Sequence, residues 1–182
     1  EEKIYIGYLS GSRTHDQDFA QVESALLEVM DHHPEVYRIL VGILDESGME
    51  RVQNRIEKLP FMDWRQLPAV IAGLDINLMP LEDSLFHCCK SENKWTEAAL
   101  VKVPSIMSRN REMEYVIENG KNGWMCRTKE EWISALESLI TDEKARRAMG
   151  EAAHQKVMEQ YLTRNTGKDA MEELLCSESY TK

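Results

Sequence analysis

The chain has 182 residues, 42% of them hydrophobic and 30% charged, which is typical of one compact domain with a substantial core. Its 22 basic and 32 acidic side chains give a formal net charge of −10, so a general affinity for nucleic acid or anionic lipid is not expected and any anion site must be local. The sequence contains neither an apolar run long enough to span a bilayer nor a secretory leader pattern.

The cysteines indicate the redox compartment of the protein, and the first residues indicate whether the chain is part of a longer one. The cysteines lack any CxxC spacing and suit neither a zinc cage nor a disulfide framework, so we expect reduced thiols in a cytoplasmic protein. They are Cys88, Cys89, Cys126 and Cys176. The chain has no initiating methionine and enters an apolar strand pattern within three residues. We therefore expect a domain cut from a longer protein.

The first half of the chain alternates strand and helix patterns. Continuous apolar runs predict buried strands of a parallel sheet over residues 4–11, 36–44 and 75–81. Between the first two, a capping box at Thr14 and Gln17 opens a helix. Its apolar positions recur at helical spacing: Phe19, Val22, Leu26, Val29 and Met30. Residues 45–62 are less regular, with RIEKLPF as a candidate short strand, and Pro68 suits the first turn of a short helix.

The second half continues the alternation. A helix is expected to begin at Ser91, with that serine as its cap, and to continue to Lys102. Strands are predicted over 104–108 and 123–126, with a helix over 111–120 between them that closes at an Asn-Gly turn. Thr128 and Glu131 form another capping box, before an apolar helix face made of Trp132, Leu136, Leu139 and Ile140. Further helices are predicted over 142–162 and near 168–176.

Strands that alternate with helices of this length imply a mostly parallel sheet with right-handed crossovers. We therefore predict one doubly wound, Rossmann-like α/β domain over residues 1–182, with extra carboxyl-terminal helices. In such sheets ligands bind beyond the carboxyl ends of the strands, where the strand order reverses. Two loops qualify: SGSRTHD (10–16) and LEDSLFHCCKS (81–91).

The segment HCCKSENKWTEAALVKVP (87–104) carries the clearest chemistry. Lys90 and Lys94 flank the expected helix start, where free amides and the helix dipole favour an anion, so together they form a candidate diphosphate clamp. Ser91 and Asn93 belong to the same turn and are included as donor-binding candidates. Glu97 lies further along the helix, and its carboxylate can accept hydrogen bonds from the paired hydroxyls of a ribose. The alternative is a solvated turn whose glutamates offset the lysines.

These residues also carry a family resemblance. EAALVKVPSIMS resembles the second half of the signature of retaining GT-B glycosyltransferases of family 4 (group 1), in their carboxyl-terminal, donor-binding domain, and the similarity covers most of the chain. Glu97 matches the second signature glutamate, which the family uses to bind the nucleotide ribose. FHCCKSENKWTE is similar to a family variant with Phe, three residues and KSxxKxxE. Downstream, MEYVIENGKNGWMC and LITDEKARRAMGEAAHQKV resemble the family's glycine turn and following helices.

The chain departs from the common family pattern in both loops. Cys89 stands eight positions before Glu97, where the first signature glutamate is expected. In the first loop the family uses a Gly-Arg pair and a later lysine to reach the donor phosphates. Here Arg13 is the candidate arginine, and Asp16, Gln17 and Asp18 occupy the region of the lysine. The lysines at 90 and 94 are expected to supply the missing charge, while Gly11 and Ser12 offer backbone amides and a hydroxyl.

The resemblance implies transfer of a sugar from a nucleoside diphosphate to a hydroxyl acceptor, with retention of configuration. It implies no metal or other cofactor, an acceptor-binding domain at the amino-terminal side, and a cytoplasmic location with peripheral attachment to the inner membrane face through that domain. No residue is assigned to bond breaking, although Lys90 and Lys94 are candidates for stabilising the leaving phosphate. Two alternatives remain: a family member made inactive at Cys89, and a nonenzymatic Rossmann-like partner-binding module.

The base, the sugar and the acceptor do not follow from the sequence. Base recognition in such folds depends heavily on backbone contacts, and we expect it near Phe61 and Met62. Among the histidines, only His87 lies in the expected donor loop and is a candidate for donor contact.

Overall fold

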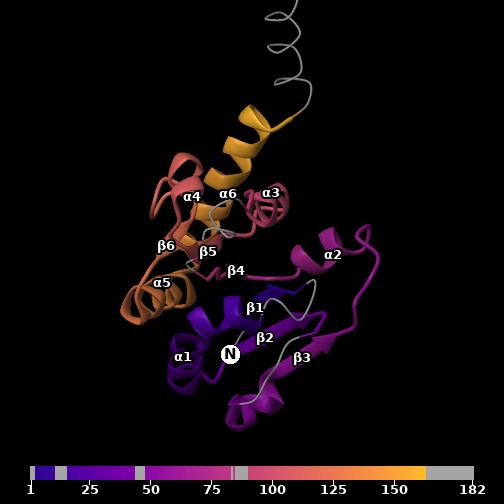
Figure 1. Ribbon diagram of the computed structural model, residues 1–182, viewed down its shortest axis with the longest axis vertical. Coiled ribbons are helices and arrows are strands. Elements are labelled where there is room, and N and C mark those ends of the chain that lie inside the picture. Colours follow the sequence, from indigo (N-terminus) through magenta and orange to yellow (C-terminus); the bar gives the residue numbers. More distant parts are fainter. Residues whose placement is uncertain (1–2, 11–15, 44–47, 83, 85–89, 163–182) are drawn as a thin grey trace, which may run out of the picture.

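The computed structural model describes residues 3–10, 16–43, 48–82, 84 and 90–162. Its centre is a six-stranded, fully parallel sheet with the order β3-β2-β1-β4-β5-β6 (Figure 1). The strands are β1 (Ile4–Leu9), β2 (Val36–Val41), β3 (Ile56–Leu59), β4 (Ile76–Met79), β5 (Ser105–Ser108) and β6 (Trp124–Cys126). The predicted doubly wound fold is confirmed, and the strand order reverses between β1 and β4.

Helices cover both faces of the sheet. They are α1 (Asp16–His32), α2 (Leu67–Ile71), α3 (Asn93–Leu100), α4 (Arg111–Val116), α5 (Lys129–Thr141) and α6 (Glu143–Gln160), with a 3₁₀ helix, η2, at Glu50–Arg55. One core layer joins β1 to α1 and α5 through buried side chains such as Ile6, Leu26 and Leu136. On the other face, α3 and α6 pack through a second layer that includes Trp95 and Val157.

The apolar periodicities are confirmed by burial. Every residue expected on the apolar face of α1, and every one expected on that of α5, is at most 5% exposed. The Thr128 capping box also forms as predicted, with both of its hydrogen bonds present. Pro68 lies in the first turn of α2, and β3 confirms the candidate strand in RIEKLPF. The Thr14 cap and the helix near 168–176 lie outside the described residues.

Two predicted helix limits were wrong. α3 begins at Asn93 after Glu92, and no side chain caps it, so Ser91 lies before the helix and is not its cap. The helix predicted over 111–120 ends at Val116. It ends early because two asparagine side chains bind the backbone beyond it: Asn122 Oδ1 accepts from Glu118 N, and Asn119 Oδ1 accepts from Met125 N in β6. Asn119 therefore fixes the turn into β6, and does not close a helix.

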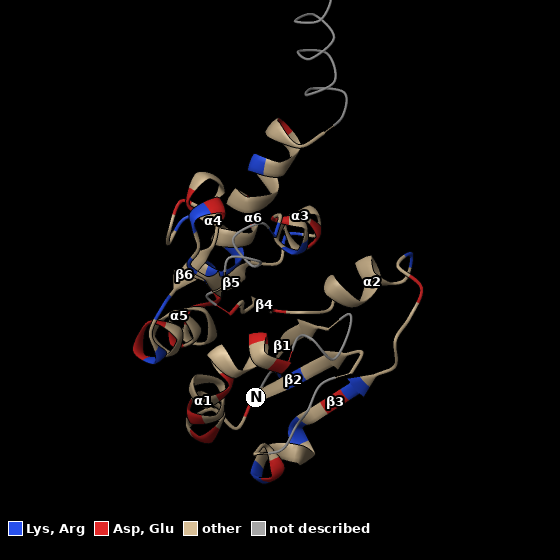
Figure 2. Ribbon diagram, viewed as in Figure 1, with Lys and Arg blue, Asp and Glu red and all other residues tan. Residues whose placement is uncertain are grey.

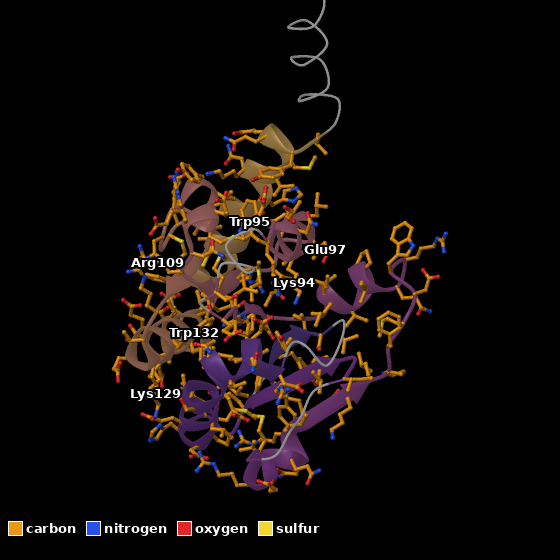
Figure 3. The ribbon with its side chains drawn as sticks, viewed as in Figure 1. Lys94, Trp95, Glu97, Arg109, Lys129 and Trp132 are labelled. Atoms are coloured by element: carbon orange, nitrogen blue, oxygen red, sulfur yellow. The ribbon has the colours of Figure 1, made fainter. Side chains whose placement is uncertain are left out.

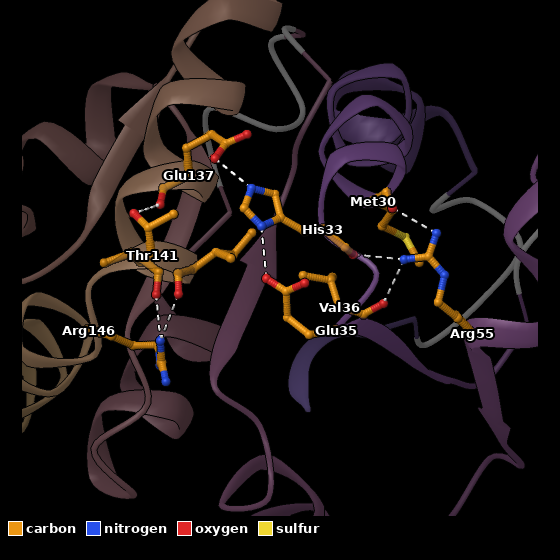
Figure 4. Close-up of polar contacts among 10 residues, drawn as sticks. Met30, His33, Glu35, Val36, Arg55, Glu137, Thr141 and Arg146 are labelled. Carbon is orange, nitrogen blue, oxygen red and sulfur yellow. Dashed lines mark hydrogen bonds and ion pairs between the residues drawn. The ribbon is translucent and has the colours of Figure 1, made fainter. Parts of the chain in front are cut away.

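His33 links the end of α1 to α5. Its Nδ1 lies 2.9 Å from Glu35 Oε1 and its Nε2 lies 2.7 Å from Glu137 Oε2 (Figure 4). Two carboxylates facing both ring nitrogens favour the imidazolium, in which both nitrogens are donors. Burial opposes protonation, but the hydrogen bonds to Glu35 and Glu137 outweigh it and raise the pKa of His33 above 6.5.

A histidine whose pKa is raised by folding stabilises the fold most below its unfolded pKa, and this stabilisation is lost as pH rises through the folded value. We expect the free energy of unfolding to fall for this reason as pH rises above about 6.5. His33→Gln should flatten that dependence, as measured by urea unfolding at each pH. His32→Gln, an exposed neighbour at the same helix end, is the matched control and should keep the wild-type slope. An unchanged slope in His33→Gln would contradict the assignment.

Candidate functional site

The switch point between β1 and β4 opens into two neighbouring cavities at the carboxyl edge of the sheet. One has a volume of about 410 Å³ and lies beyond β1 and β2, with Leu9, Val41 and Phe61 in its wall. The other has a volume of about 380 Å³ and lies beyond β4, next to Met79. Lys94 lines both cavities, so its side chain lies where the two spaces meet.

α3 positions this lysine because the residues next to it on the helix are anchored in the core. Trp95, Ala98 and Ala99 are fully buried, and the indole Nε1 of Trp95 donates to Asn122 O at 3.0 Å. The small alanine side chains allow the helix to approach the sheet closely. Figure 3 shows Trp95 and Lys94 on different sides of α3, with Lys94 toward the sheet edge. The packing of α3 therefore fixes where the charged residues of the helix lie.

Lys94 is a partly buried cation. Its Nζ lies 5.2 Å from the centre of the Tyr8 ring, close enough for a cation–π attraction. Burial lowers the pKa of Lys94, and the nearby positive charge of Lys90 lowers it further, against opposing effects of Asp18 and Glu97. Burial and the charge of Lys90 therefore make the charged form of Lys94 less stable than in water, and a bound anion would stabilise it.

Lys90 has a partner that the sequence did not predict. Its Nζ forms a 3.1 Å ion pair with Asp18 Oδ2, from the first turn of α1. The Asp18 side chain is 1% exposed, and its other oxygen accepts from Glu82 N at 2.9 Å. Asp18 stands in the region where the family pattern has a lysine. The structure thus places an aspartate where a phosphate-binding cation was expected and pairs it with one of the two predicted lysines.

Glu97 lies one turn beyond the helix start and lines the same 410 Å³ cavity as Lys94. Partial burial of its carboxyl group raises its pKa, an effect that Lys94 opposes. Ser91 and Asn93 line the 380 Å³ cavity together with Lys90. The structure therefore brings together five of the eight predicted donor-binding residues. The other three, Gly11, Ser12 and Arg13, lie outside the described residues, as do His87 and Cys89.

An aromatic wall completes the apolar cavity. Phe61 and Trp64 are 75% and 69% exposed, and both line the 410 Å³ cavity with Met62. Exposed aromatic rings beside a cavity can stack on a planar ligand. The sequence predicts base recognition near Phe61 and Met62, and both residues line this cavity. Trp64 was not predicted, although the FMDW cluster soon after the β3 strand pattern indicates an aromatic surface there.

In the described part of the chain, no group of three or more His, Cys, Asp or Glu side chains could hold a metal ion. No helix among the same residues is long and apolar enough to cross a membrane.

Cavities at the topological switch point of a parallel sheet define a ligand-binding domain of the Rossmann type. A family model described as glycosyl transferase-like matches residues 18–174, which is most of the chain. The chain belongs to this glycosyl transferase-like family, and its fold is that of the carboxyl-terminal domain of group 1 glycosyltransferases with the GT-B fold. No curated protein matches the chain.

Several solved structures share the fold. The carboxyl-terminal domain of a glycosyl transferase group 1 family protein (LpcC) from Francisella tularensis is 18% identical, with a TM-score of 0.68 over 88% of this chain and 87% of that one. Anabaena HepE in complex with UDP and glucose is 16% identical, with a TM-score of 0.73 over 95% of this chain and 48% of HepE. WaaG, a glycosyltransferase involved in lipopolysaccharide biosynthesis, is 14% identical, with a TM-score of 0.70 over 93% and 46%. The chain thus spans about half the length of HepE and WaaG.

Proposed function

We propose that this domain binds a nucleoside-diphosphate sugar and, within a longer chain, takes part in transfer of the sugar to a hydroxyl acceptor with retention of configuration. The observation that carries the proposal is the position of Lys94, which lies between an apolar, aromatic-walled cavity and a second cavity that contains Lys90. A nucleoside diphosphate has the same order of parts: a planar base, a ribose and then a dianionic diphosphate.

We assign the base, the ribose and the diphosphate of the donor to different residues of the two cavities. The base lies against Phe61 and Trp64, and the carboxylate of Glu97 accepts hydrogen bonds from the ribose hydroxyls. The diphosphate lies beside Lys94 and Lys90 in the 380 Å³ cavity. Two ammonium groups placed there before the reaction would stabilise the negative charge that develops on the diphosphate as the glycosidic bond breaks. The contribution of this domain to catalysis is therefore electrostatic.

The test is calorimetric titration of the chain with UDP, GDP and ADP at low salt. UDP is the first choice because HepE was solved with it. Glu97→Gln should weaken UDP binding by about fivefold, since a hydrogen bond to a charged group contributes about 1.5–3 kcal/mol and the amide oxygen retains part of it. The same substitution should have little effect on 2′,3′-dideoxy-UDP, which lacks both ribose hydroxyls.

Two results would reject the proposal. Failure of all three nucleotides to bind would exclude a donor site of this kind. An equal effect of Glu97→Gln on UDP and its dideoxy analogue would remove the ribose role of that carboxylate.

The proposal extends to the whole protein. An amino-terminal domain would bind the acceptor, so the 182 residues alone should bind donor and transfer nothing, and donor binding should not change when a chelator is added. The proposal includes a cytoplasmic location, with which the free, buried thiol of Cys126 is consistent.

Cys89, at the position of the first signature glutamate, favours a second candidate function: a donor-binding family member without transferase activity. Binding without transfer after joining to the acceptor domain would identify it.

A further inference from the structure

A third cavity lies at the same carboxyl edge, beyond β5 and β6. Its volume is about 370 Å³, and its wall contains three arginines, Arg109, Arg111 and Arg127, with no acidic residue among those that line it. This concentration of positive charge is unusual for a chain with a formal net charge of −10. Figure 2 shows basic residues near the junctions of β5 and β6 with the helices that follow them.

Strand register brings two of the arginines together. Ser108 and Cys126 are the last paired residues of β5 and β6, and Arg109 and Arg127 follow them directly. The ladder continues one step, because Arg109 N donates to Cys126 O at 2.8 Å. Both arginines therefore leave the sheet at the same level of its edge. Arg111 is the first residue of α4, whose start is fixed by Asn110 Oδ1 accepting from Met113 N at 2.8 Å.

The neighbouring acids offset only part of the charge of this cluster. Arg109 lies 3.3 Å from Glu114, but Arg111 and Arg127 form no ion pair with any residue that the structure describes. The carboxylate of Glu131 accepts from the backbone amides of Arg127 and Thr128, and the charges of Arg109 and Arg127 lower its pKa further. Gathering guanidinium groups without enough counter-charge is unfavourable, and a bound anion removes that repulsion.

The wall also carries a neutral donor. The side-chain nitrogen of Asn110 is buried and has no hydrogen-bond partner among the described residues. The buried side chains of Trp132 and Cys126 form the apolar part of the wall. Arginine binds phosphate through paired, parallel hydrogen bonds, so this donor set fits a phosphate group better than a lone carboxylate.

We propose that this arginine pocket, formed by Arg109, Asn110, Arg111 and Arg127, binds a phosphate group separately from the donor diphosphate. Leu81 lines both this pocket and the cavity of Lys90, so the two open side by side. Phosphate binding here does not depend on the proposed transferase function.

The experiment follows amide chemical shifts of the whole chain during titration with inorganic phosphate. It uses a Lys90→Ala/Lys94→Ala background, so the lysine site cannot account for the binding. Phosphate should shift the amides around Arg109 and Arg127, and adding Arg111→Gln and Arg127→Gln should weaken the affinity by about tenfold or more, through loss of charge-assisted hydrogen bonds. Arg147→Gln, at an arginine on α6 that is 80% exposed and paired with Glu143, is the matched control and should have no effect.

The outcomes separate this pocket from the donor site. Unchanged phosphate affinity after loss of both arginines would overturn the proposal, as would shifts confined to the region of α3. Thermal unfolding of each variant shows whether it is folded. In a chain that keeps Lys90 and Lys94, the Arg111→Gln/Arg127→Gln substitutions should leave UDP affinity unchanged.

Discussion

Replacing Lys94 with methionine is expected to weaken UDP binding by about tenfold or more, because a charge-assisted hydrogen bond contributes about 1.5–3 kcal/mol. Methionine keeps an unbranched apolar stem beside Tyr8 and removes only the charge, so the fold should be retained. The loss should be large because Lys94 lines both donor cavities and its charge is already partly desolvated. Calorimetric titration at low salt measures the change.

The pH dependence of UDP affinity provides a second test of the role of Lys94. Burial and Lys90 lower the pKa of Lys94 below its ordinary value of 10.5, and a bound diphosphate would raise it again. UDP affinity should therefore fall as pH rises through the lowered pKa, and this part of the pH dependence should be missing in Lys94→Met. Lys121→Ala, at a lysine 66% exposed and paired with Glu118, is the matched control. UDP binding by Lys94→Met at wild-type strength would contradict the role of Lys94.

The fold could be predicted from the sequence because the patterns that indicate its helices and strands are local. The apolar spacing from Phe19 to Met30, the continuous run of β2 and the Thr128 capping box each depend on residues a few positions apart. The position of α3 after a strand end also followed from local order, and this placed Lys94 and Glu97 at the switch point.

Long-range pairing was not predictable in the same way. Asp18 and Lys90 are separated by 72 positions, and only the parallel pairing of β1 with β4 brings their loops together. The same reason explains the arginine pocket, since Arg109 and Arg127 become neighbours through the register of β5 and β6. The start of α3 was misplaced because Ser91 has the residue type of a cap, whereas the helix forms without one.

The lysine pair therefore differs in kind from the clamp that the sequence predicted. Lys90 already has a buried carboxylate partner, so a diphosphate would bind beside an ion pair and not between two unpaired ammonium groups. Lys94 is then the stronger attraction for the diphosphate, and α3 must be held firmly for its position to be maintained.

Trp95 provides that anchor, and Trp95→Ala is expected to lower the free energy of unfolding by about 3–5 kcal/mol. The side chain is fully buried, its ring centre lies 5.9 Å from that of Tyr161 in an edge arrangement, and its Nε1 donates to Asn122 O. Alanine leaves a large cavity between α3 and α6 and removes the donor for that carbonyl. Urea unfolding measures the loss.

Trp95→Phe helps to separate the two contributions, because it keeps an aromatic ring in the core while it removes the indole donor and part of the ring volume. It should cost about 1–3 kcal/mol, the range for a buried acceptor left without its partner. Since Trp95 does not line either donor cavity, UDP affinity in Trp95→Phe should change less than in Lys94→Met, measured well below the unfolding temperature. Wild-type stability in Trp95→Ala would mean that α3 is held mainly by other contacts. If Trp95→Phe lost as much UDP affinity as Lys94→Met, the position of α3, and not the charge of Lys94, would limit donor affinity.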